Sequence, residues 1–193
     1  MVFTGNVGGV PGLAFSPEGR FIASAGKDRS VRIWNVPNET HVRSITGFGE
    51  SIQTLAFSPK GDMLVTGDWS GAVRIWDTTT WDELMTIELS DGKCVWSVAF
   101  SADGQYLAAS VGRPGRGGVY LWRVLRDQVS RASVRVEPQH PPSVSPAVCI
   151  HFSQNCELLA WVDDNNAPLR DVHIWNLKES RELPKTWGQA IES

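Results

Sequence analysis

Two short phrases alternate along this chain of 193 residues, and their repetition constrains its fold more than any other feature. The first phrase is an apolar run that ends in a turn: LAFSPEG (13–19), LAFSPKG (55–61), VAFSADG (98–104) and, in degraded form, IHFSQNC (150–156). The second phrase follows each of these and ends in tryptophan: SVRIW (30–34), AVRIW (72–76), GVYLW (118–122) and DVHIW (171–175). Self-similarity at a period of about 42 residues predicts four tandem copies of one supersecondary unit.

Within each copy the local pattern is that of short strands. The second copy shows four extended segments separated by turn residues: SIQTLAFS, DMLVTG, AVRIWD and TTTWDELMTIEL. None of them carries a sustained 3.6-residue period, so we expect no helices in the repeat. Four short antiparallel strands cannot bury both apolar faces alone, and the copies must therefore stack on one another.

A four-stranded unit with V-x-x-[LV]-A-F-S-[PA]-x-G and then [VI]-x-[IL]-W resembles the WD-repeat β-propeller family, over essentially the whole chain. The resemblance implies an all-β fold, a β-propeller of about four blades, each a four-stranded antiparallel sheet. The dipeptide that names the family survives only as Trp76-Asp77. We expect one propeller segment over residues 1–193, with these blades: 6–46, 47–89, 90–137 and 144–184.

The resemblance also implies a structural role for the tryptophan that closes each second phrase: Trp34, Trp76, Trp122 and Trp175. Family members carry a buried Ser–His–Asp–Trp hydrogen-bond network, whose histidine follows a glycine. Here Asn6 and Phe48 stand in that place, and only Ser24, Asp28 and Trp34 make a partial set. We therefore expect blades held mainly by apolar packing.

The repeat pattern continues to both ends of the chain. Residues 185–193 align with the loop and first residues of another blade, so we expect them to start a fifth one. Residues 2–5 align with 44–47, the end of an outer strand. Propellers usually have 4–8 blades, and two interrupted ends favour an incomplete part of a larger ring. Open blade edges then predict self-association.

Composition excludes several classes of partner. The 18 basic and 21 acidic residues are scattered singly, and this argues against a nucleic-acid partner. The N-terminus lacks the features of a signal peptide, and no run approaches the roughly 18 apolar residues of a membrane span. Three cysteines are too few for a disulfide framework. We predict a cytoplasmic protein that binds no membrane.

Residues for catalysis or for a cofactor do not converge in the repeat. His173 occupies an outward position on a third strand and is expected to be exposed, whereas His151 is expected between blades with a hydrogen-bond partner. Cys149, His151 and Cys156 lack zinc spacing and a fourth ligand. We predict no enzymatic activity, no cofactor and no metal.

Two insertions contain residue types that ligand sites often use. The glycine-rich segment 111–119 lacks the helix start and the Gly-Lys-Ser/Thr of a phosphate loop, so a hairpin tip is the favoured interpretation, and anion contact through Arg113 and Arg116 is the alternative. The acidic segment 162–171 lacks the ligand order of a calcium loop and is interpreted as a solvated loop.

Recognition of a partner at the protein surface is the remaining class of function. In the family that this chain resembles, partners often meet the face formed by the starts of the innermost strands and the turns before the tryptophan strand. The residues expected there are Trp96, Gln53, Lys27, Arg29, Asp68, Trp69 and Arg113. Trp96 is the most informative because exposed aromatic residues are common anchors of interfaces. Packing of Trp96 on a neighbouring blade is an equal alternative, and Trp69 is more simply explained as a cover for its own turn.

The leading hypothesis is a non-catalytic scaffold that presents a propeller face to another protein or peptide. The alternative is a regulatory or sensor segment of a larger signalling enzyme, such as a kinase or an NTPase. The fold alone does not separate these two.

Overall fold

The computed structural model describes residues 2–89, 94–113, 116–126, 134–143, 147–163 and 171–183. Every regular element in these ranges is a β-strand, and the strands form four separate antiparallel sheets of four strands each. The expectation of an all-β protein built from four-stranded blades is thereby confirmed.

The strands follow the chain order within each sheet. Sheet 1 consists of β1 (Gly12–Phe15), β2 (Phe21–Ala25), β3 (Val31–Asn35) and β4 (Thr40–Ile45). Sheet 2 consists of β5 (Ile52–Phe57), β6 (Met63–Asp68), β7 (Ala72–Asp77) and β8 (Glu83–Glu88). Sheet 3 consists of β9 (Cys94–Phe100), β10 (Tyr106–Arg113), β11 (Arg116–Arg126) and β12 (Val134–Ser143). Sheet 4 consists of β13 (Ala147–Phe152), β14 (Leu158–Asp163), β15 (Val172–Asn176) and β16 (Arg181–Glu182).

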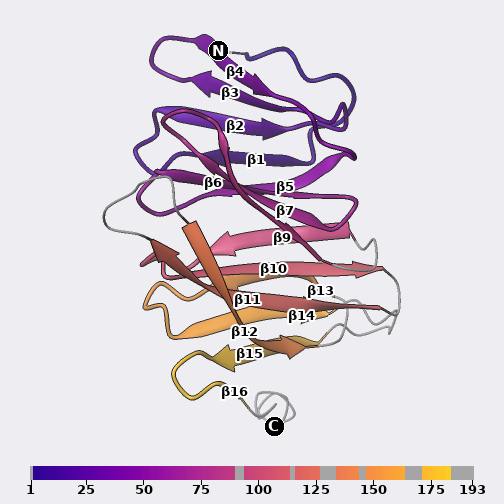
Figure 1. The fold of residues 1–193 in the computed structure, drawn as a ribbon, viewed down its shortest axis with the longest axis vertical. Helices are drawn as coiled ribbons and strands as arrows, with labels where there is room; N and C mark the ends of the chain where they lie inside the picture. Colours follow the sequence, from indigo (N-terminus) through magenta and orange to yellow (C-terminus); the bar gives the residue numbers. More distant parts are fainter. Residues whose placement is uncertain are drawn as a thin grey trace, which may run out of the picture.

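The sheets stack in sequence order and do not close into a ring. Figure 1 shows sheet 1 at one end of the long axis and sheet 4 at the other, with sheets 2 and 3 between them. Three apolar clusters join the stack: one between sheets 1 and 2, one between sheets 2 and 3, and one between sheets 3 and 4. The architecture is therefore an open array of about four propeller blades.

The first repeated phrase builds the innermost strand and the turn that follows it. Its serine hydroxyl accepts the backbone N–H of the first residue of the second strand, at 2.8–3.0 Å, in every sheet: Ser16 from Phe21, Ser58 from Met63, Ser101 from Tyr106 and Ser153 from Leu158. Its glycine has φ of +71° at Gly19, +73° at Gly61 and +71° at Gly104. Cys156 replaces that glycine in sheet 4 and keeps a positive φ of 57°. The phrase recurs because the turn needs both features.

The second repeated phrase builds the third strand of each sheet. Its tryptophan is always paired with an apolar residue of the second strand: Trp34 with Ile22, Trp76 with Leu64, Trp122 with Leu107 and Trp175 with Leu159. This common register places equivalent side chains on equivalent faces of all four sheets. Consequently, a side chain in one sheet can be compared directly with its three counterparts.

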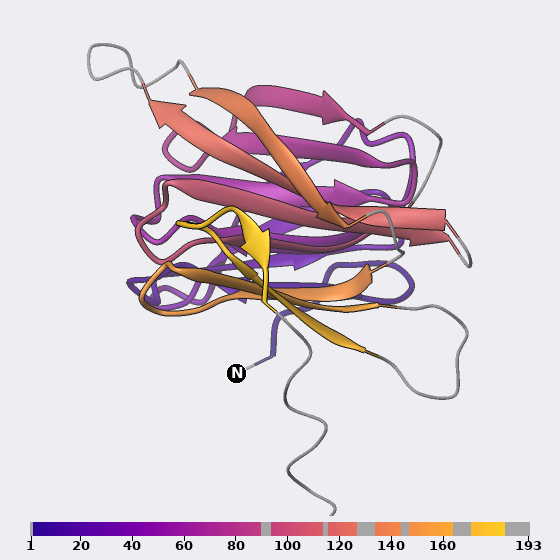
Figure 2. The same cartoon turned by 90° about the horizontal axis from the view of Figure 1, so that it is seen from below.

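The insertion at 111–119 lengthens a hairpin. Pairing of β10 with β11 continues to Arg113 and Arg116, and Figure 2 shows this hairpin reaching past the ends of the strands beside it. Strand β12 ends at Ser143, beyond the expected blade limit of 137. Residues 185–193, interpreted from the sequence as the start of a fifth blade, lie outside the described residues.

Candidate functional site

The innermost strands of sheets 2, 3 and 4 each begin with a β-bulge, which sets the direction of one side chain. The ladder between β5 and β6 skips Gln53, the ladder between β9 and β10 skips Trp96, and the ladder between β13 and β14 skips Val148. A bulge leaves one residue unpaired and turns its side chain away from the regular pleat. The repeat pattern predicted surface positions for Gln53 and Trp96, but the bulge itself is a finding of the structure.

Trp96 points toward the turn between β6 and β7, where Trp69 lies. The two rings meet edge to face, with centroids 5.4 Å apart and planes at 74°. The indole N–H of Trp96 donates to the carbonyl of Gly112 at 3.0 Å. Trp69 is 44% exposed and Trp96 is 38% exposed. Sheets 2 and 3 thus jointly present two tryptophans in contact with each other and with solvent.

The turn under Trp69 is held by Asp68. One carboxylate oxygen of Asp68 accepts the backbone N–H groups of Ser70 and Ala72 at 2.9 and 3.0 Å, and the Ser70 hydroxyl at 2.6 Å. The backbone N–H of Trp69 donates to the Ser51 carbonyl at 2.9 Å. Asp68 is only 2% exposed, so its expected place on the binding surface is wrong: the residue supports the turn from behind.

The corresponding turn of sheet 1 carries two cationic residues. Lys27 and Arg29 are both exposed, and Arg29 adopts a φ of 61°. The turn is tied down by the Lys27 backbone, whose N–H donates to Gly9 and whose carbonyl accepts from Ser51. We call the surface formed by Lys27, Arg29, Gln53, Trp69 and Trp96 the tryptophan rim. The side chain of Arg113, expected at the same rim, lies outside the described residues.

Asp28, between these cations, is fixed as a carboxylate. It accepts the Val7 N–H at 2.8 Å and the Ser30 hydroxyl at 2.7 Å, and it pairs with Arg32 at 2.8 Å. Partial burial works in the opposite direction, but these hydrogen bonds and the Arg32 charge together lower the pKa of Asp28 to about 2.

Asn6 takes part in the polar network of sheet 1, a role that the sequence did not suggest. Trp34 donates its indole N–H to the Ser24 hydroxyl at 3.2 Å, and that hydroxyl donates to the Asn6 side-chain carbonyl at 2.8 Å. The neighbouring Val7 N–H completes the link to Asp28. The residue after Gly5 therefore joins the chain of hydrogen bonds, although it is not histidine.

Sheet 2 replaces most of this network with aromatic packing. Trp76 donates to the Thr66 hydroxyl at 3.1 Å, which matches the bond from Trp34 to Ser24. Phe48, in the place of Asn6, lies against Trp76 with a centroid distance of 5.4 Å and is buried. An apolar ring thus fills the site that holds a polar group in sheet 1.

Two expectations about histidines are wrong. The side chain of His173 is 13% exposed because it stacks on Trp161 and lies between two carboxylates, with Glu182 at 2.6 Å and Asp163 at 3.1 Å. Burial opposes protonation, but the hydrogen bonds and charges of Glu182 and Asp163 raise the pKa of His173 overall. His151, expected between blades, is exposed because no described sheet covers that side of sheet 4.

Asp163, Asp171 and His173 bring potential ligand atoms within 4.8 Å of one another. His173 and Asp163 already use theirs for a mutual hydrogen bond, and the Asp171 backbone N–H donates to Asp163 at 3.1 Å. These contacts link β14 to β15, which is a structural role.

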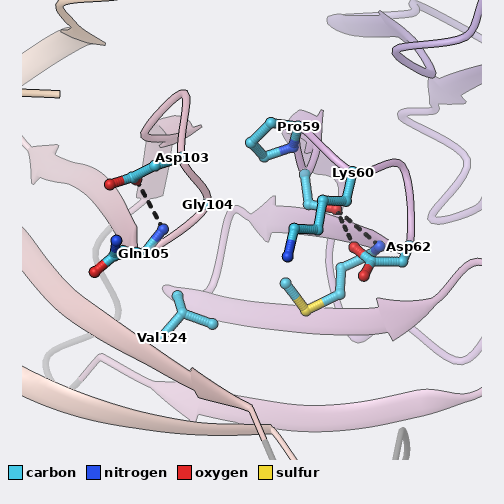
Figure 3. Close-up of a pocket in the computed structure, with 9 residues that line it drawn as sticks. Pro59, Lys60, Asp62, Asp103, Gly104, Gln105 and Val124 are labelled. Atoms are coloured by element: carbon cyan, nitrogen blue, oxygen red, sulfur yellow. Dashed lines mark hydrogen bonds between the residues drawn. The ribbon is translucent and has the colours of Figure 1, made fainter. Parts of the chain in front are cut away.

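A cavity of about 150 Å³ lies at the opposite end of the strands, between sheets 2 and 3. Figure 3 shows Lys60 and Asp62 on one side of it and Asp103 and Gln105 on the other. Hydrogen bonds from Ser101 and from the Gln105 N–H outweigh partial burial and lower the pKa of Asp103, so its carboxylate serves its own turn. The cavity is smaller than the roughly 300 Å³ at which ligand pockets begin. It is a groove between blades.

The stacked sheets and the repeated turn chemistry define a β-propeller repeat protein. A family model described as "WD domain, G-beta repeat" matches residues 1–35, 39–77 and 81–123, and the chain belongs to this WD-repeat family. No curated protein matches the chain. Domains of this family are generally protein-interaction scaffolds and are typically non-catalytic.

The matched segments are offset from the sheets. Residues 39–77 include β4, the outer strand of sheet 1, together with the three inner strands of sheet 2. Residues 81–123 likewise include β8 of sheet 2 and β9, β10 and most of β11 of sheet 3. Each sequence repeat therefore ties one sheet covalently to the next.

Within the described ranges, the structure contains no helix that could span a membrane.

Proposed function

We propose that this chain is a non-catalytic interaction module that binds another protein or a peptide on its tryptophan rim. The observation that carries the proposal is the exposed contact between Trp69 and Trp96. In the described part of the chain, the tryptophans at other positions are buried or half-buried: Trp34, Trp76, Trp81, Trp122, Trp161 and Trp175.

An exposed tryptophan pair is a favourable anchor for physical reasons. Each ring offers a large apolar surface, together with an N–H group at its edge. The ring of Trp96 is already held by Gly112, and the turn of Trp69 is held by Asp68, so little side-chain entropy remains to be lost on binding. Such residues are the ones that most often dominate binding energy.

The charges of the rim suit a partner with acidic residues beside an apolar anchor. Lys27 and Arg29 lie in the sheet 1 turn that corresponds to the turn of Trp69. Exposed cations at the edge of an apolar contact chiefly raise the association rate and its salt dependence. A reducing, cytoplasmic setting suits such a module, because three cysteines are too few for a disulfide framework.

The experiment starts from a random peptide library displayed on phage and selected on the immobilised 193-residue chain. The affinity of a selected peptide is then compared for the wild type and for Trp69→Ala, Trp96→Ala and Val42→Ala. We expect each rim substitution to weaken binding about 30-fold, the effect of losing a contact worth about 2 kcal/mol. Val42→Ala is the control, because Val42 is a 41% exposed apolar residue of the outer strand β4, outside the rim.

Circular dichroism must show that each variant keeps the wild-type fold. Selected peptides that bind both rim variants as tightly as the wild type would refute the proposal. A library that yields no binder to the wild type would refute it as well.

A further inference from the structure

The two end sheets of the stack each have an apolar face that no other described sheet covers. Leu13 in sheet 1 is 63% exposed, whereas its counterparts are almost completely buried: Leu55 at 7%, Val98 at 6% and Ile150 at 1%. Those three pack on the preceding sheet. Leu13 has the same type of side chain on the same face, but no sheet of the described residues precedes sheet 1 in the stack.

Sheet 4 shows the converse pattern. Val172 is 63% exposed, whereas its counterparts Val31, Val73 and Val119 are all 0% exposed, because each packs on the following sheet. His151 is exposed at the position where Ala14, Ala56 and Ala99 pack against the three apolar clusters. The free face of sheet 4 is therefore of the kind that receives a following sheet.

These two faces are complementary halves of one recurring interface. Between sheets 1 and 2, the cluster joins Ala23, Val31 and Ile33 of one sheet to Leu55, Leu64 and Trp76 of the other. The common register gives sheet 4 the first set, as Ala160, Val172 and Ile174. It gives sheet 1 the second set, as Leu13, Ile22 and Trp34. A contact of sheet 4 on sheet 1 would continue the interface that is already formed three times within the chain.

The outer part of the sheet 1 face is already prepared for such a contact. Phe3 stacks on Trp34 with a centroid distance of 5.2 Å, and the Val7 N–H binds Asp28. This segment covers Trp34 much as Phe48 covers Trp76 in sheet 2. The charge of Arg32 is paired with Asp28 at 2.8 Å. What remains uncovered is the inner, apolar part, with Leu13 and Phe15.

We propose that the free face of sheet 4 in one copy of this chain packs on the free face of sheet 1 in a second copy. The contact joins two different surfaces, so each copy uses both of its ends. Two copies then close a ring of eight blades, which lies within the range of known propellers. Sheet faces, rather than strand edges, make this association.

Sedimentation velocity of the 193-residue chain tests the proposal. We expect a reversible dimer at about 100 µM, a concentration that reveals micromolar dissociation constants. Leu13→Asp and Val172→Asp should each sediment as monomers, because each places an unpaired charge in both interfaces of the ring. Val42→Asp is the control, since Val42 is 41% exposed on the outer strand β4.

A mixture of the two monomeric variants gives the sharpest result. The intact sheet 4 of Leu13→Asp can pack on the intact sheet 1 of Val172→Asp, so the mixture should form a heterodimer with one interface. A wild-type chain that stays monomeric, a dimer that survives both substitutions, or a mixture that does not associate would each overturn the proposal. Trp69→Ala and Trp96→Ala should still dimerise, which keeps this test separate from that of the tryptophan rim.

Discussion

Leu13 and Leu55 form a matched pair for measuring what one blade contributes to the next. Both belong to the phrase LAFSP and occupy the same position of the innermost strand. Leu55 is 7% exposed in the cluster between sheets 1 and 2, whereas Leu13 is 63% exposed. Truncation to alanine therefore removes the same atoms from a closed and from an open environment.

The expected magnitudes follow from burial. Leu55→Ala loses the transfer free energy of the buried methyl groups and leaves a cavity, so we expect a loss of about 3 kcal/mol in the free energy of unfolding. Leu13→Ala leaves no enclosed cavity and loses only a fraction of the transfer term, so we expect a loss below about 1 kcal/mol. The difference, about 2 kcal/mol, is the effect of the covering sheet at this position.

Urea unfolding, followed by tryptophan fluorescence, measures both losses. The protein concentration should be about 1 µM, so that association does not stabilise the wild type. Ile150→Ala serves as a second buried comparison, because Ile150 is 1% exposed between sheets 3 and 4. Equal losses for Leu13→Ala and Leu55→Ala would refute the conclusion that sheet 1 ends the stack with an open face.

Three further predictions concern the polar contacts and the turns. The ordinary pKa of Asp28 is 3.8 and its pKa in the fold is about 2, so the carboxylate stabilises the folded state above pH 3.8 and loses this effect as the pH falls through about 2. Asp28→Asn should therefore lower the free energy of unfolding by about 2 kcal/mol at neutral pH and by much less at pH 2. Urea midpoints measure this loss, and a loss that does not depend on pH would contradict the prediction. The raised pKa of His173 adds stability that is fully present below pH 6.5 and is lost as the pH rises through the raised value, so thermal midpoints should fall over that interval in the wild type but not in His173→Gln. Gly19 has a φ of +71° and open space around a Cβ position, so Gly19→Ala should destabilise the protein by about 1 kcal/mol through backbone strain alone, whereas an unchanged urea midpoint would show that the turn can rearrange.

The sequence allowed the blades to be predicted because the information for them is local and repeated. The serine and the glycine of the first phrase are needed within a single turn, as Ser58 and Gly61 show. The apolar alternation of the second phrase is needed within a single strand. Requirements of this kind recur wherever the unit recurs, so comparing four copies separates them from accidental similarity.

The arrangement of the tryptophan rim was only partly predictable, because it depends on neighbouring sheets. The repeat pattern predicted Trp96 and Trp69 as separate surface residues. Their contact arises from a bulge in β9 and from the stacking of sheet 3 on sheet 2. Asp68 was expected at the surface, but hydrogen bonds to its own turn bury its carboxylate. A position in a repeat indicates the strand and the turn, but it does not state what the next sheet places beside them.

The dependence on distant parts of the chain also explains why the surroundings of His173 and the polar network of sheet 1 were not predicted. His173 occupies an outward position of its strand, yet Trp161 and the carboxylates of two neighbouring strands enclose it. Asn6 accepts from Ser24, 18 residues away along the chain. The repeat pattern by itself determined the secondary structure, the register and the family of this protein. Only the tertiary structure decided which equivalent positions are covered and which are open, because burial is a property of the neighbouring sheet and not of the residue.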